Sequence, residues 1–286
     1  MMINLESTEH FSEGYVSTTD GLKIYYKKLK PENPKKNIVI VPGFGANANQ
    51  FLGMQHFFYE NGFCSIIVEL RGHGYSEGIP GYVENYSDYC KDIDQVINDV
   101  CEKDLNTIIC GHSNGGLAST YYTVNNLNKV SGLILFSPWF ALSTPLKWYE
   151  IILKTVALII YPKLAAPMGK RGGEAEGCTT NEVWIKILNS DKQLYKWASA
   201  KSNDEVEKAQ TLCFGNANQI NQPVILIHGK GDPVTSYEAS KNMFQLFSSK
   251  NKMMISLDKN IHHPFLEEDN VKQIYCKILK FINEKI

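Results

Sequence analysis

One stretch, Cys110-Gly111-His112-Ser113-Asn114-Gly115-Gly116, constrains the fold of this chain more than any other. It follows a short apolar run at residues 107–110 and precedes a predicted helix at residues 117–125. A strand, a tight turn and a helix, with the pattern G-x-S-x-G at the turn, are typical of a nucleophile elbow. The two outer glycines leave room where the strand and the helix crowd together. The stretch therefore predicts that Ser113 is presented as a nucleophile at the carboxyl end of a sheet.

Apolar strands alternate with periodic helical segments along the first half of the chain and return near its end. Such alternation predicts crossover units and a mostly parallel sheet. A hairpin turned by Asp20-Gly21 is expected to come before it. The predicted strands are residues 37–41, 63–70, 107–110, 133–136, 224–228 and 252–257, and the predicted helices include 48–61, 86–103, 148–161 and 271–284.

The alternation stops between residues 140 and 222, where helical segments follow one another without a strand-then-helix unit. This break indicates an insertion into one sheet rather than a second sheet-containing domain. Residues 1–139 and 223–286 are therefore predicted to form one core, and residues 140–222 a helical insertion after the sixth strand.

Composition excludes several classes of partner. The net charge is −1, so no nucleic-acid surface is expected. The seven cysteines are odd in number and lack a C-x-x-C pair, which predicts reduced, buried thiols. Residues 1–13 are polar and show no secretory signal, and a cytoplasmic protein is therefore expected. The histidines show no ligand spacing beyond the adjacent pair His262-His263, so neither a metal nor a cofactor is predicted.

A serine nucleophile needs a general base, usually histidine, and the base needs an orienting carboxylate. Asp232 comes just after the predicted strand at 224–228, and His262 and His263 follow the strand at 252–257. The chain order serine, acid, histidine is one of the known orders of this triad. The residues alone predict Asp232 as the acid and leave the base open between His262 and His263.

Catalysis also needs hydrogen-bond donors directed at the developing oxyanion. The backbone N–H of Asn114, directly after the nucleophile, is the first candidate. The second is expected in the loop after the first parallel strand, Pro42-Gly43-Phe44-Gly45-Ala46, whose glycines allow close approach of a ligand. The Phe44 N–H is the predicted second donor.

Three segments together resemble the monoacylglycerol lipase and lysophospholipase branch of the α/β-hydrolase-fold serine hydrolases. Residues 69–78 are similar to that family's Asp-x-Arg-Gly-His-Gly-x-Ser-x-Gly, with Glu69 in place of the usual aspartate. Residues 232–234 resemble its acid loop. Residues 262–267 resemble its His-x-Pro-Phe-Leu-Glu pattern, in which the first histidine is the base, and this favours His262.

The resemblance implies an α/β-hydrolase fold, with a mostly parallel central sheet flanked by helices and a helical cap formed by the insertion. It also implies a structural role for Arg71 and His73. One segment departs from the family, whose oxyanion loop usually reads His-Gly-x-Gly-Glu. Here the leading histidine is Pro42 and the trailing glutamate is Ala46, so any role of those two side chains is lost or replaced.

The activity that the resemblance implies is hydrolysis of carboxylic esters of monoacyl lipids, a monoacylglycerol or a lysophospholipid, through an acyl-enzyme. A small lipid ester is thus the expected partner, with no cofactor. The apolar start of the insertion suggests a channel for one acyl chain and transient contact with a membrane surface. Packing on the protein's own core is the alternative. The residues expected to bind substrate are Trp139, Ile151, Val156 and Ile159.

Two other functions stay open from the sequence. An aminopeptidase or amidase of the same fold would need an acidic group near the serine to hold a free amine, and the insertion offers Glu150, Glu174 and Glu176. A catalytically silent binding protein would usually lack one member of the triad. The sequence does not specify acyl length, headgroup or oligomeric state.

Overall fold

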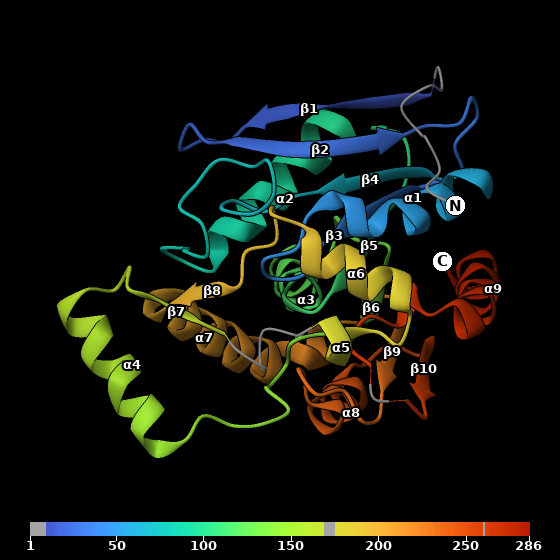
Figure 1. The fold of residues 1–286 in the computed structure, drawn as a ribbon. Helices are drawn as coiled ribbons and strands as arrows, with labels where there is room; N and C mark the ends of the chain where they lie inside the picture. The colour runs from blue at the N-terminus through green and yellow to red at the C-terminus, as the bar shows by residue number, and fades with distance from the viewer. Residues whose placement is uncertain (1–9, 169–174, 260) are drawn as a thin grey trace.

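A single sheet of eight strands organises the protein, as the computed structural model shows for residues 10–168, 175–259 and 261–286 (Figure 1). The strand order is β1-β2-β4-β3-β5-β6-β9-β10. Strands β1 and β2 form the predicted antiparallel hairpin, and β3 to β6, β9 and β10 run parallel. The strands are β1 (Phe11–Ser17), β2 (Lys23–Leu29), β3 (Asn37–Val41), β4 (Cys64–Val68), β5 (Thr107–His112), β6 (Gly132–Phe136), β9 (Val224–Gly229) and β10 (Lys252–Leu257).

Helices cover both faces of this sheet, so each central strand is buried on two sides. In β3, Val39 and Val41 face one core, whereas Ile38 and Ile40 face the other. Buried side chains of α2, α3 and α8 belong to the first core, and those of α1 and α9 to the second. This explains the continuous apolar runs in the sequence. The helices are α1 (Leu52–Glu60), α2 (Ser87–Val100), α3 (Asn114–Asn125), α8 (Tyr237–Leu246) and α9 (Glu268–Lys285).

The segment between β6 and β9 contains four α-helices and a small antiparallel pair of strands in its described residues. Its last helix, α7, packs against α3, and Val206, Ala209 and Cys213 enter the core. Part of the predicted insertion thus completes the layer of helices over the sheet, and the division at residues 140 and 222 stays a prediction. The elements are α4 (Trp148–Ile160), β7 (Ala165–Pro167), α5 (Ala175–Cys178), α6 (Glu182–Ser190), β8 (Trp197–Ser199) and α7 (Ala200–Asn216).

Helix α4 differs from the other long helices because none of its residues is buried. It lies at the outer edge of the molecule, away from the sheet (Figure 1). Lys154 Nζ of this helix lies 2.6 Å from Glu207 Oε2 of α7. The sequence predicted the helix, but packing on the protein's own core is not its role.

The loop at residues 69–78 is held by buried charges. Arg71 Nη2 lies 2.6 Å from Asp92 Oδ1, and Arg71 Nη1 lies 2.6 Å from Asp20 Oδ2. His73 is buried, and its Nδ1 lies 2.9 Å from the carbonyl oxygen of Arg71. These contacts tie the hairpin, the loop and α2 together, which agrees with the structural role that the resemblance implies.

All seven cysteines are free, in agreement with the predicted reduced state. Six of them are buried, but Cys276 on α9 is exposed, because it lies on the solvent side of that helix, and the expectation of burial was wrong there. Of the helices in the described ranges, none is both long and apolar enough to span a bilayer.

Candidate active site

Ser113 occupies the turn between β5 and α3, with φ 53° and ψ −119°. A positive φ is uncommon for a residue with a side chain and strains the backbone here. The flanking glycines make the turn possible. A Cβ on Gly111 would lie 2.3 Å from the Gly115 carbonyl oxygen, and one on Gly115 would lie 2.0 Å from that of Val41. Glycine is therefore required at both positions of the elbow, because a backbone carbonyl oxygen occupies the space that a Cβ would need.

Asp232 and His262 come from the loops that follow β9 and β10, and the fold brings their side chains together. Nδ1 of His262 lies 2.8 Å from Oδ2 of Asp232. Both side chains are buried, and Ser113 and His262 line the same cavity. The arrangement leaves Nε2 of His262 as the ring nitrogen available to a serine hydroxyl. Within the described residues, His263, the alternative base, makes no such contact with Asp232.

The Asp232 carboxylate is held ionised. Burial raises its pKa, but the charge of His262 and hydrogen bonds from His228 and His262 outweigh burial, so the pKa lies well below its usual range. Its other oxygen, Oδ1, accepts the backbone N–H groups of Val234 and Thr235 at 2.8 and 3.0 Å. An anion in this position can orient an imidazole and stabilise its protonated form.

Sequence reasoning missed two side chains that hold this aspartate. Nε2 of the fully buried His228 lies 3.1 Å from Asp232 Oδ2, and the Thr235 hydroxyl donates to the same oxygen at 3.0 Å. Both residues lie within four positions of the acid. His228 was visible as a polar residue at the end of an otherwise apolar strand, which was the available signal.

The insertion fixes the loops that carry the site. The carbonyl oxygen of Cys178 on α5 accepts the backbone N–H groups of His262 and His263, at 3.0 and 2.7 Å. The N–H of Tyr195 donates to the Gly45 carbonyl oxygen at 3.0 Å and so holds the glycine loop. Thr179 adds a hydroxyl hydrogen bond of 2.6 Å to a carboxylate oxygen of Glu267, just beyond the histidine loop. The sequence predicted an insertion but not these anchors.

The two predicted oxyanion donors come from the start of α3 and from the loop after β3. Asn114 is the first residue of α3, where a backbone N–H has no partner within the helix. Phe44 lines the cavity, and its ring meets those of His73 and Trp139 edge-on, with centroids 5.0 and 6.4 Å apart. The contact with His73 packs the glycine loop against the loop at residues 69–78.

A cavity with an empty volume of about 660 Å³, solvent-open part included, lies over Ser113. Of the four side chains predicted to bind substrate, only Trp139 lines it. Ile151, Val156 and Ile159 are on α4, with exposed fractions of 48%, 45% and 79%, and none of the three lines the cavity. The apolar wall comes instead from Met168, Ala175, Leu188, Leu194 and Val234.

The same cavity has a polar floor. Gln50 is buried, and neither atom of its side-chain amide has a hydrogen-bond partner. Nδ1 of His112 and Nδ1 of His263 are likewise buried without partners. Burial, with neighbouring imidazoles adding to it, lowers the pKa of His263 to about 3 and that of His112 well below its ordinary value. Both rings are therefore neutral at neutral pH.

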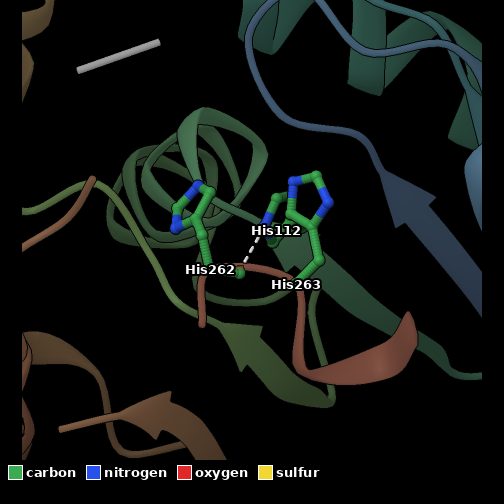
Figure 2. Close-up of side chains that lie close together, drawn as sticks. All are labelled: His112, His262 and His263. Carbon is green, nitrogen blue, oxygen red and sulfur yellow. Dashed lines mark hydrogen bonds between the residues drawn. The ribbon is translucent and has the colours of Figure 1, made fainter. Parts of the chain in front are cut away.

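His112, the residue before the nucleophile, supports the histidine loop rather than acting as the base. Its Nε2 lies 3.0 Å from the carbonyl oxygen of His262, the contact drawn as a dashed line in Figure 2. Its ring centroid lies 4.7 Å from that of His262 and 4.6 Å from that of His263. The figure shows the three imidazoles crowded together where β5 and the loop after β10 meet.

Of the three acidic residues that an aminopeptidase could use, the two that the structure describes are not at this cavity. Glu150 caps the start of α4, where its carboxylate accepts the Lys147 N–H, and Glu176 accepts a hydrogen bond from Asn189. Neither side chain lines the cavity, and Glu174 lies outside the described residues. Among the described lining residues the charged side chain is that of Lys196.

Comparison with known proteins identifies the family of this chain. Residues 32–269 match Hydrolase_4, the family described as serine aminopeptidase, S33. The chain belongs to this family of α/β hydrolases. The resemblance to monoacylglycerol lipases and lysophospholipases and the predicted α/β-hydrolase fold are thus confirmed.

Three individual proteins illustrate the likeness. The chain is 23% identical to an uncharacterized abhydrolase domain-containing protein of Dictyostelium discoideum, over 94% of its own length but only 28% of that protein's. It is 21% identical to a probable lysophospholipase L2 of Haemophilus influenzae, covering 96% of the chain and 92% of the relative. A soluble variant of monoglyceride lipase from Saccharomyces cerevisiae, solved with a substrate analog, superposes with a TM-score of 0.83 at 19% identity, covering 97% and 96% of the two chains.

Proposed function

We propose that this protein hydrolyses carboxylic esters of monoacyl lipids through an acyl-enzyme on Ser113. The observation that carries the proposal is the hydrogen bond of 2.8 Å between His262 and Asp232 in a cavity that Ser113 also lines. Relatives named lysophospholipase and monoglyceride lipase support the choice of substrate class.

In the proposed mechanism, the Ser113 oxygen attacks the ester carbonyl carbon while its proton passes to Nε2 of His262. The backbone N–H groups of Phe44 and Asn114 stabilise the negative charge on the carbonyl oxygen. Asp232 keeps the imidazole in its productive tautomer and stabilises its protonated form. The imidazolium then protonates the leaving alkoxide, and the acyl group stays on Ser113. Water, deprotonated by His262, attacks the acyl-enzyme and releases the carboxylic acid.

The cavity supports an ester with one apolar arm and one polar arm. The apolar wall suits an acyl chain, whereas Gln50 on the floor offers an unpaired amide to a hydroxyl-bearing alcohol. Amide hydrolysis at a free N-terminus is the second candidate because the family is described as serine aminopeptidase. The lining favours the ester, because a free ammonium group would find Lys196 rather than a carboxylate among the described lining side chains.

A substrate panel tests the proposal. Monoacylglycerol, lysophosphatidylcholine, a short aryl ester and an aminoacyl-arylamide would be compared on the wild type and on Ser113→Ala. We expect turnover of the monoacyl lipids, no arylamide cleavage, and labelling of the wild type by a fluorophosphonate probe. Turnover retained in folded Ser113→Ala would refute the assignment of the nucleophile, and arylamide cleavage above ester cleavage would favour the peptidase.

We further propose that α4 contacts a lipid surface from which substrate is collected. Trp148, Leu153, Ile159 and Ile160 are each at least 66% exposed, which is unusual for large apolar side chains on one helix. The apolar side chains of a surface helix insert into the headgroup and acyl boundary of a membrane. The expected contact is transient and leaves the sheet in solution.

Vesicle flotation tests this contact. We expect Ile159→Glu to reduce binding to phosphatidylcholine vesicles and turnover of lipid presented in vesicles, with unchanged turnover of a soluble short-chain ester. Val183→Glu is the matched control, because Val183 is 63% exposed on α6, away from α4. Equal effects of the two substitutions, or none from Ile159→Glu, would contradict the proposal.

A further inference from the structure

Three buried imidazoles meet at the floor of the active site. His112, His262 and His263 are 2%, 4% and 8% exposed. One ring nitrogen from each can be chosen so that all three lie within 4.8 Å of one another. Figure 2 shows their rings side by side, with His112 in β5 and the other two in the loop after β10. Structural packing accounts for the burial of these rings but leaves two of their nitrogens without partners.

In two of the three histidines, His112 and His262, the second ring nitrogen has a hydrogen bond of the kind that metal-binding histidines make. A histidine that binds zinc usually donates its second ring N–H to a carbonyl or a carboxylate, which fixes its tautomer. Nε2 of His112 contacts the His262 carbonyl oxygen at 3.0 Å, and Nδ1 of His262 contacts Asp232 at 2.8 Å. The lone pairs are then on His112 Nδ1 and His262 Nε2. His263 adds an Nδ1 that is buried without a partner.

We propose that His112, His262 and His263 form a binding site for Zn²⁺, and that the bound ion reversibly inhibits the enzyme. Three imidazoles with water as the fourth ligand are a known zinc coordination. Zinc–nitrogen bonds of about 2.1 Å in a tetrahedron put ligand nitrogens about 3.4 Å apart, so the rings need to approach one another by about 1.4 Å at most. The cavity that contains Ser113 gives the ion its entry path, since all three histidines line it.

Inhibition follows because the ion and the reaction need the same lone pair. Nε2 of His262 accepts the Ser113 proton in the proposed mechanism, and zinc bound there prevents this transfer. The proposed ion is therefore an inhibitor and not a cofactor. The sequence prediction that the reaction uses no metal cofactor is compatible with it. Inhibition rests on the proposed function, whereas metal binding does not, so the two are measured separately.

Binding is measured on the double variant Ser113→Ala/Cys276→Ser, which has no nucleophile and no exposed thiol. Titration with ZnCl₂ in a calorimeter gives stoichiometry and affinity, and CoCl₂ reports the ligands by its visible spectrum. We expect one ion per chain with strong four-coordinate d–d bands. His263→Phe and His112→Gln in this background are each expected to weaken binding by about 10-fold or more. His56→Gln, a histidine outside the cluster paired with Glu60, is the control and should leave binding unchanged.

Several results would overturn the site. These are the absence of saturable binding, an affinity unchanged from the Ser113→Ala/Cys276→Ser background in both cluster variants, or a near-ultraviolet thiolate charge-transfer band that assigns the ion to Cys178, which also lines the cavity. Circular dichroism identifies a cluster variant that fails to fold. In that case the cobalt spectrum of the Ser113→Ala/Cys276→Ser protein, with all three histidines present, tests the site without the variant. On wild-type enzyme, ZnCl₂ should abolish turnover of a short ester, and EDTA should restore it. Binding without inhibition would show that the ion does not occupy the lone pair of His262 Nε2 that the reaction needs.

Discussion

His228 and Asp232 are joined beneath the active site, with 3.1 Å between His228 Nε2 and Asp232 Oδ2. The same oxygen lies 2.8 Å from His262 Nδ1, so one carboxylate oxygen bridges two imidazoles. Nδ1 of His228 lies 2.9 Å from the Ser240 hydroxyl oxygen. This hydroxyl can donate to Nδ1, which favours the tautomer whose Nε2–H donates to the aspartate. His228 is therefore a positioning residue for the acid.

Replacement of His228 by glutamine should impair the chemical step rather than substrate binding. A buried hydrogen bond to a charged group contributes about 1.5–3 kcal/mol, so we expect kcat to fall by about 10-fold or more with KM little changed. The acidic limb of the pH profile of kcat/KM should also shift, because the Asp232 charge acts on His262. Steady-state kinetics on a soluble ester from pH 5 to 9 measure both effects.

His56→Gln provides the matched control, since Nε2 of His56 pairs with Glu60 at 2.9 Å, on a helix away from the cavity. It should retain the wild-type kcat and pH profile. If His228→Gln loses stability but keeps the wild-type pH profile of kcat/KM, His228 has a packing role only.

The sequence was sufficient to predict the sheet and the order of the triad candidates, because each signal was local. Apolar runs predicted strands that are buried on both faces. The glycines at 111 and 115 indicated that backbone atoms pass close to both positions, and the structure places a carbonyl oxygen against each of them. Asp232 and His262 could be proposed because parallel strands deliver the loops at their carboxyl ends to one edge. The recognised family pattern then separated His262 from His263.

The insertion could not be predicted in the same way, since its contacts depend on tertiary packing. Ile151, Val156 and Ile159 are apolar and helical, but apolarity alone does not tell a substrate channel from an exposed face. The anchor from Tyr195 to Gly45 is made by backbone atoms and leaves no mark on side-chain pattern. His228 had a local signal, but its partner depended on how the following loop turns back.

Gly45 tests the anchor between the insertion and the oxyanion loop. It has φ +73°, and a Cβ there would lie 1.9 Å from the Tyr195 carbonyl oxygen. Gly45→Ala should therefore displace the loop, lower kcat by about 10-fold or more, and destabilise the fold by about 1–3 kcal/mol. Gly53→Ala is the control, because its Cβ meets nothing within 4 Å in α1, and it should preserve activity and stability. Kinetics and urea denaturation of both variants measure these effects. An active and stable Gly45→Ala would contradict the close approach of Gly45 to the Tyr195 carbonyl oxygen.

Asp92 tests the structural role of the loop at residues 69–78. Asp92→Asn replaces the buried carboxylate beside Arg71 by a neutral amide and leaves the exposed Asp20 as the remaining charged partner of the guanidinium. Breaking a buried pair costs about 3–5 kcal/mol. We expect that loss in urea denaturation, with near wild-type kcat for the molecules that remain folded. Asp94→Asn, on the same helix, loses a partly exposed pair with Lys129 and should cost about 1 kcal/mol or less. A selective loss of kcat in folded Asp92→Asn would instead connect this loop to the chemistry.

Glu69, which replaces the family's aspartate, predicts a pH-dependent stability. Burial raises its pKa to about 7 from an ordinary 4.5, against the lowering effect of N–H groups from Ala48 and Tyr75. Because the pKa in the folded state is the higher one, the folded protein binds an extra proton between these values. The free energy of unfolding therefore falls as the pH rises from about 4.5 to 7, by about 3 kcal/mol in total, and the contribution is fully present below 4.5. Urea denaturation at pH 5, 6, 7 and 8 should show this fall in the wild type and in the exposed control Glu284→Gln, but a flatter dependence in Glu69→Gln. Identical pH dependence in all three proteins would mean that Glu69 stays ionised throughout, held by its two backbone hydrogen bonds.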